Sequence, residues 1–148
     1  MKRVLLDSNV FLHALGSDAA LRAACTSIID AVSEDRLAGE AAVVIINEIV
    51  HVRHRRTGDR RRAVADGRAA AQVVLLHSID DVDTASALDA FQAHEGLQMN
   101  DAVLVAVALR HGLTTILSTD RGFDGIPGLR RVDPADAEAV AALVASSG

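Results

Sequence analysis

Residues 3–12 read Arg-Val-Leu-Leu-Asp-Ser-Asn-Val-Phe-Leu, so a short apolar run ends at a carboxylate, Asp7. Charged side chains are rarely buried, and an acid directly beside a buried run therefore needs an explanation. In a parallel α/β sheet the carboxyl ends of the strands lie along one edge, where ligands bind. We predict that Asp7 shares such an edge with three other acids that adjoin apolar runs: Glu48 after Val43-Val44-Ile45-Ile46, Asp101 before 102–110, and Asp120 after Thr115-Ile116-Leu117.

The rest of the chain alternates short β-branched runs with longer stretches of helical periodicity. Strands are predicted at 3–6, 42–46, 73–76, 115–117 and 129–132. Helices are predicted at 19–37, from about 47 through the Arg-rich region, again after a break at 57–59, and at 81–95, 100–111 and 134–144. Asp59 and Asp133 are predicted to cap helix N-termini, and Gly96 and Gly112 to end helices. Strands separated by helices predict right-handed crossovers and a mostly parallel sheet in one domain, residues 1–148.

The composition is that of a globular domain, with 50% hydrophobic and 24% charged residues in 148. Cys25 is the only cysteine, which excludes an intrachain disulfide and a thiolate metal cluster. The first apolar run is too short for a signal peptide or a membrane span. We therefore expect a cytoplasmic protein with no membrane partner.

The acid-bearing segments resemble, in order, the four motifs of PIN-domain nucleases. They are Val-Leu-Leu-Asp-Ser-Asn-Val-Phe-Leu (4–12), Asn-Glu-Ile-Val (47–50), Asn-Asp-Ala-Val-Leu-Val-Ala (100–106) and Ser-Thr-Asp-Arg-Gly-Phe (118–123). The resemblance covers essentially the whole chain and is strongest to the VapC-type toxin ribonucleases of toxin–antitoxin pairs. It implies an α/β fold with three layers, α/β/α, around a four- to five-stranded, mostly parallel sheet. It also implies a metal-dependent endoribonuclease that acts on RNA, forms a homodimer and pairs with a small antitoxin protein.

By motif position, the resemblance assigns catalytic and metal-binding roles to Asp7, Glu48, Asp101 and Asp120, with Asp124 as a fifth metal candidate. Ser118 inherits a supporting polar role. The chemistry also follows from the acids themselves: one or two Mg²⁺ or Mn²⁺ ions neutralise clustered carboxylates, activate water and stabilise charge on phosphate oxygens. Ser8 and Asn9 can hydrogen-bond this site or cap the helix that follows.

A basic segment, His51–Arg68, follows Glu48 and carries a net charge of +5, whereas the rest of the chain carries about −10. Arginine holds phosphates well, so this segment, in particular Arg53, Arg55 and Arg56, is predicted to bind RNA or an acidic part of the antitoxin. A solvated helix face is the alternative. Aromatic residues are only 2% of the chain, which favours contacts to the RNA backbone over base stacking.

Each motif also has a simpler explanation. Asp7 can be a helix N-cap, Glu48 and Asp101 can be first-turn acids, and Asp120 can be a turn residue. His51 and His54 follow Glu48 at helical spacing and can suggest zinc, although solvated or phosphate-contacting histidines fit better. A phosphatase of the haloacid dehalogenase type needs a second Asp where Asn9 stands. An RNA-processing nuclease without a toxin role, and a degenerate module that only binds RNA or a partner, remain alternatives.

Overall fold

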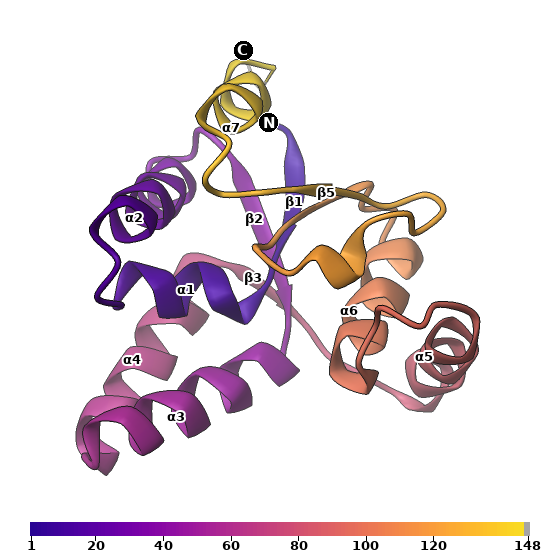
Figure 1. Ribbon diagram of the computed structural model, residues 1–148, viewed down its shortest axis with the longest axis horizontal. Helices are drawn as coiled ribbons and strands as arrows, with labels where there is room; N and C mark the ends of the chain where they lie inside the picture. The colour runs from indigo at the N-terminus through magenta and orange to yellow at the C-terminus, as the bar shows by residue number, and fades with distance from the viewer. Residues whose placement is uncertain (147–148) are drawn as a thin grey trace.

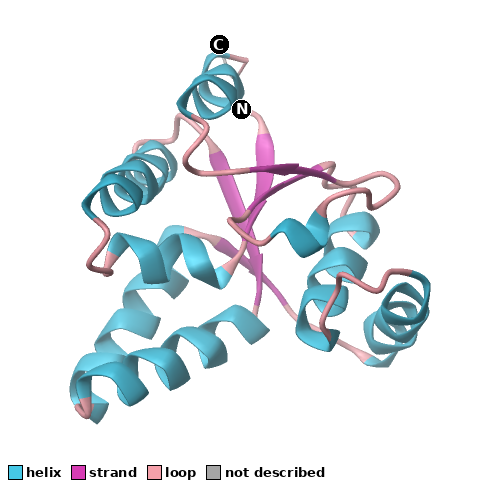
Figure 2. Cartoon of the chain, viewed as in Figure 1, coloured by secondary structure: helices cyan, strands magenta, loops and turns pink. Residues whose placement is uncertain are grey.

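The computed structural model describes residues 1–146, and in this range five strands and seven α-helices form three layers (Figures 1 and 2). The elements are β1 (Arg3–Leu6), α1 (Ser8–Ala14), α2 (Ala19–Ser33), β2 (Ala38–Ala42), α3 (Val44–Thr57), α4 (Arg60–Val73), β3 (Leu75–His77), α5 (Asp81–Ala93), α6 (Met99–Arg110), β4 (Thr115–Leu117), the 3₁₀ turn η1 (Arg121–Phe123), β5 (Arg130–Val132) and α7 (Ala137–Ala145). The predicted α/β fold class is confirmed.

The sheet has the order β3-β2-β1-β4-β5, and every neighbouring pair is parallel. From β1 the chain moves outward through β2 to β3, and then crosses to β4 and β5 on the other side of β1. In Figure 1, helices α1–α4 accordingly lie on one side of the sheet and α5 and α6 on the other. The strand order reverses between β1 and β4, and the carboxyl ends at such a point form the binding crevice of open α/β sheets.

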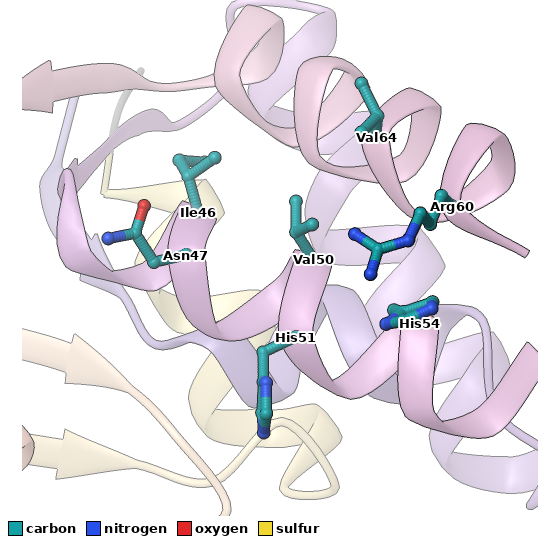
Figure 3. A pocket seen from close by; sticks show the side chains of 8 residues that line it. Ile46, Asn47, Val50, His51, His54, Arg60 and Val64 are labelled. Carbon is teal, nitrogen blue, oxygen red and sulfur yellow. The ribbon is translucent and has the colours of Figure 1, made fainter. Parts of the chain in front are cut away.

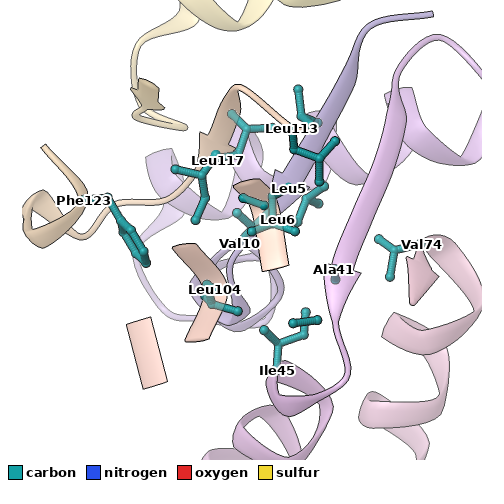
Figure 4. Packing of buried hydrophobic residues seen from close by; sticks show 14 of the residues in the cluster. Leu5, Leu6, Val10, Ala41, Ile45, Val74, Leu104, Leu113, Leu117 and Phe123 are labelled. Atoms are coloured by element: carbon teal, nitrogen blue, oxygen red, sulfur yellow. The ribbon is translucent and has the colours of Figure 1, made fainter. Parts of the chain in front are cut away.

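The two central strands are buried on both faces. Leu5 and Leu6 of β1 and Ile116 and Leu117 of β4 have no exposed surface, and helix and loop residues such as Leu104 and Phe123 pack around them (Figure 4). Strands covered by helices on both faces read as continuous apolar runs. This is why strands 3–6 and 115–117 could be predicted within a residue, and both predictions are confirmed.

The strand predicted at 42–46 is wrong, because the β-branched run lies in the first turn of α3, where Ile45 is fully buried. The true strand, β2, reads Ala-Gly-Glu-Ala-Ala and contains a buried acid. Glu40 accepts hydrogen bonds from Arg3 Nε (2.6 Å) and pairs with His77 Nε2 (2.5 Å), which ties β2 to both neighbouring strands. A short apolar run does not distinguish a strand from a buried helix, and tertiary packing decided here.

Several boundaries also differ from the prediction. The third strand is Leu75–His77 rather than 73–76, and the first long helix ends at Ser33 rather than 37. Asp136, not Asp133, caps α7, because Asp133 accepts from Ala135 N in the preceding turn. Gly96 does not end α5, whose C-cap is His94.

The caps predicted at two other positions are confirmed. Asp59 accepts a hydrogen bond from Arg62 N at the start of α4, and Gly112 follows α6 with a left-handed φ of 69°. No helix in the described part of the chain is both long and apolar enough to cross a membrane.

Candidate active site

Asp7 follows β1 directly and is the N-cap of α1, so its carboxylate lies at the reversal point of the sheet. Its side chain is buried, with 4% of the residue exposed. Oδ1 accepts a hydrogen bond from Ser8 N (2.7 Å), while Oδ2 accepts from Ser118 Oγ (2.7 Å) and from Asn9 Nδ2 (3.0 Å). The capping role proposed as the simpler explanation is therefore real, but one cap bond does not account for a buried acid that is also held from β4.

Ser118 connects the ends of β1 and β4. Its fully buried hydroxyl donates to Asp7 and accepts from Asn9 Nδ2 (3.0 Å) and from Asp120 N (3.0 Å). Asn9 Oδ1 in turn accepts from Thr119 N (3.3 Å). The hydroxyl, the amide and the two loop N–H groups thus fix the orientation of Asp7 and the course of the loop that carries Asp120.

The acids are coupled electrostatically, and burial adds to the effect of their mutual repulsion. Burial is the main cause that raises the pKa of Asp7 to about 6, and the charges of Asp101 and Glu48 add to it against the hydrogen bond from Ser118. Burial also raises the pKa of Asp101 to about 6, with further contributions from Asp120 and Glu48. Asp7 is within reach of the charges of Asp101 and Glu48, and Asp101 is within reach of those of Asp120 and Glu48, so the four acids form one electrostatically linked group.

Glu48 and Asp120 are the exposed members of the group, whereas Asp7 is buried and Asp101 partly buried. Glu48 lies on α3 and lines an open groove of about 500 Å³ together with Asn100, which precedes Asp101. Asn47, His51 and Arg55 line the same groove. Arg55 therefore shares a groove with Glu48, as expected for a side chain that contacts a polyanion near the site.

The donor set suits a hard divalent cation, because four carboxylate side chains offer only oxygen ligands. Within residues 1–146, no three His, Cys, Asp or Glu side chains already surround a single point in a way that would hold a metal ion. Mg²⁺ itself keeps several water ligands and takes only one or two protein carboxylates directly.

Two predicted site residues are placed elsewhere. Asp124 pairs with Arg131, with its oxygens 2.7 and 3.3 Å from Nε and Nη2, and this pairing lowers its pKa. Arg53 is buried, and its Nε donates to Asp66 Oδ2 (2.7 Å), so it joins α3 to α4 rather than facing solvent. Arg55 and Arg56 are exposed. Ser8 is buried at the start of α1, where its N–H holds Asp7.

Two positioning features had no clear signal in the sequence. Arg131 in β5 donates to the carbonyl oxygen of Ser118 (3.0 Å) and so supports the loop that follows β4. Gly122, after Asp120, packs against Gly96, before α6, so closely that a Cβ on Gly122 would overlap the Gly96 carbonyl oxygen. Both contacts join segments distant in sequence, and only the strand order would have predicted them.

Comparison with known proteins agrees with this geometry. Residues 4–129 match the family model of the PIN domain. The chain is 33% identical over 143 residues to Ribonuclease VapC7 of Mycobacterium tuberculosis, which covers 95% of this chain and 97% of that protein.

Two solved structures share the fold. One is a toxin–antitoxin complex from Klebsiella pneumoniae (TM-score 0.61, 20% identity, 88% of this chain and 97% of that chain). The other is Mycobacterium tuberculosis VapC20, described as a sarcin-ricin loop cleaving toxin (TM-score 0.65, 17% identity, 82% and 90%). The domain match and the similarity to VapC7 over nearly the full length of both chains lead to one conclusion: the chain belongs to the PIN domain family, within its VapC branch.

Proposed function

We propose that the protein is a Mg²⁺- or Mn²⁺-dependent endoribonuclease that serves as the toxin of a VapBC-type pair. This proposal rests mainly on the four electrostatically coupled carboxylates near the point where the strand order reverses. The relatives support the substrate class, since VapC7 is named a ribonuclease and VapC20 is described as cleaving the sarcin-ricin loop.

Asp7 and Asp101 are the residues that would hold the ion most directly, with Glu48 and Asp120 beside them. When bound, Mg²⁺ or Mn²⁺ activates water and neutralises phosphate oxygens. Ser118 and Asn9 hold one oxygen of Asp7 in place, so that the carboxylate does not need to reorganise. Glu48, exposed in the groove, orients the attacking water or accepts its proton, while Arg55 holds a neighbouring phosphate of the RNA.

We further propose an antitoxin partner, a homodimeric assembly and a cytoplasmic setting. The Klebsiella pneumoniae structure supports the first, since it is a toxin–antitoxin complex of the same fold. Exposed apolar side chains on α5 and α6, including Val82, Phe91 and Leu109, support the second, because such patches often mark protein contacts. Light scattering of the purified protein would measure the oligomeric state.

The test of the site is cleavage of RNA by Asp7→Asn and Asp101→Asn. Each variant removes one charge of the set, and we expect the rate in Mn²⁺ to fall by about 100-fold or more, equivalent to several kcal/mol of lost transition-state stabilisation. Asp89→Asn, an exposed acid of α5, is the matched control and should cleave normally. Full activity of Asp7→Asn would refute the assignment, and growth arrest on expression without an antitoxin would separate a toxin from an RNA-processing nuclease.

A further inference from the structure

We propose that the pocket between α3 and α4 is a nucleotide subsite that takes one unstacked base of the RNA and the phosphate attached to it. The pocket has a volume of about 380 Å³ and is lined by Ile46, Asn47, Val50, His51, His54, Arg60, Ala63 and Val64 (Figure 3). This volume lies in the range of about 300–1,000 Å³ that is usual for small-ligand sites. The inference rests on the proposed function, because it identifies how the same enzyme would hold its substrate.

The lining has two chemically distinct parts. Ile46 and Val50 of α3 and Ala63 and Val64 of α4 form apolar walls, and Val64 keeps 39% of its surface exposed although it is aliphatic. Apolar walls contact the faces of a base, and single-stranded RNA is recognised through bases that have left the stack. The Asn47 amide provides both a donor and an acceptor for the edge of such a base.

The polar part of the lining favours an anion. Arg60 of α4 and His54 of α3 lie at the same end of the pocket (Figure 3), and no Asp or Glu lines it. None of the ion pairs found among residues 1–146 uses Arg60, His51 or His54, in contrast to Arg53 on the same helix pair. One arginine and two histidines beside apolar walls match a nucleotide better than they match an apolar peptide.

The position of the pocket connects it to the acids. Asn47 and His51 line both this pocket and the groove that contains Glu48 and Asn100. A strand of RNA whose scissile phosphate lies at the acids can therefore place a neighbouring nucleotide between α3 and α4 without leaving the protein surface. His51 would then lie where the RNA backbone passes from the groove to the pocket.

The pocket lies beside a close approach of α3 and α4. A Cβ on Gly67 of α4 would come within 2.5 Å of Val50 Cγ2, so a glycine is needed where the helices touch. Arg60, Ala63 and Val64 lie one to two turns earlier on α4, where the hollow opens. The geometry of the helix pair thus shapes the subsite.

The experiment measures binding of a fluorescent eight-nucleotide single-stranded RNA in the cleavage-deficient Asp7→Asn background, beside an abasic ribose-phosphate octamer of equal charge. Val64→Glu puts an acid into the pocket, and Ala65→Glu, also exposed on α4 but outside the lining, is its matched control. We expect Val64→Glu to weaken binding of the RNA about tenfold more than Ala65→Glu does. For the abasic octamer, the difference in binding between these two variants should be much smaller.

A second pair of variants, Arg60→Gln and its control Arg61→Gln, tests the phosphate contact without introducing an acid. This pair tests the inference even if Val64→Glu does not fold. Equal weakening within both pairs, or equal affinity of the unmutated pocket for the RNA and the abasic octamer, would overturn the inference. The inference would also be overturned if Val64→Glu lost binding of a poly-glutamate peptide but kept binding of RNA. That result would mean that the pocket binds an acidic protein segment. Cleavage of RNA by the wild-type protein in Mn²⁺ is measured separately. An absence of cleavage would contradict the proposed function and not the subsite.

Discussion

The carboxylate of Asp7 accepts hydrogen bonds from donor groups of three residues and yet is costly to ionise, because it is buried near two other acids. Its pKa rises from 3.8 to about 6 on folding. An acid whose pKa is raised in the folded state stabilises the protein fully below its unfolded pKa, and this contribution is lost as the pH rises through the folded pKa. The metal-free protein should therefore lose stability between about pH 4 and pH 6.

Denaturation with urea in EDTA at several pH values measures this effect. The loss attributable to Asp7 should be on the order of 2–3 kcal/mol, at about 1.4 kcal/mol per pKa unit. Asp7→Asn should show a correspondingly flatter profile. Superimposable pH profiles of the two proteins would contradict the assignment of the shift to Asp7.

At the same scale, the sequence predicted the acids better than their supports. Asp7 and Asp120 follow the central strands β1 and β4, whose apolar runs are unmistakable, so their convergence could be predicted. Asp124 has the right residue type in the right region, but Arg131 neutralises it. That pairing depends on β5 lying beside β4, and nothing in the local sequence indicates it.

Among the elements, the α3–α4 pair is joined by a buried ion pair. Arg53 keeps only 8% of its side chain exposed and Asp66 18%. Removing one partner leaves the other charge poorly solvated, so Arg53→Ala should lower the free energy of unfolding by about 2–4 kcal/mol, somewhat below the cost for a fully buried pair. Arg56→Ala on the exposed face should change it by less than about 0.5 kcal/mol. Equal effects in urea denaturation would show that Arg53 acts as a surface charge.

The loops before α6 and after β4 are a second case in which contact between elements determines the site. Gly122→Ala would force the Gly122 and Gly96 backbones apart, and with them the loops that carry Asp120 and Asp101. We expect metal affinity, measured by calorimetry, to fall about 10- to 100-fold, as it does when groups supporting metal ligands are disturbed.

Gly96→Ala is the control for this contact, since its Cβ would lie 3.4 Å from Gly122 Cα, an ordinary van der Waals distance. It should bind metal almost normally. If both variants bind metal as the wild type does, the contact between the glycines does not position the acids.

The segment between α2 and α3 was the hardest to predict, in element type as well as in boundaries. The run Val43-Val44-Ile45-Ile46 has strand propensity, but it forms the junction and first turn of α3, with Ile45 in the core. The strand before it is built from small residues and needs Gly39, because a Cβ there would come within 2.8 Å of Val32 Cγ1. Packing against α2, rather than local preference, placed that strand.

The whole molecule separates its charges. The topology gathers acids at the reversal point of the sheet, whereas the surplus of arginines lies on α3 and α4, next to the groove that contains Glu48. A net negative protein can therefore still attract a polyanion locally, because screening limits charge effects to about 10 Å at 0.1 M salt. If the protein acts on RNA as proposed, we expect the acidic site to repel the RNA until a cation is bound and the basic helices to hold the RNA nearby.

This arrangement predicts the salt dependence of RNA binding. Each phosphate contact to single-stranded RNA contributes about 0.7 to the slope of log K against log salt concentration. Replacing both Arg55 and Arg56 with Gln should reduce that slope by about 1.4 in fluorescence titrations of the cleavage-deficient protein. Replacing Arg22 and Arg36 with Gln removes the same charge from α2 and the turn after it and should leave the slope nearly unchanged. An unchanged slope in the Arg55 and Arg56 variant would mean that these arginines do not contact RNA phosphates, and their charge would then be available for an acidic protein partner.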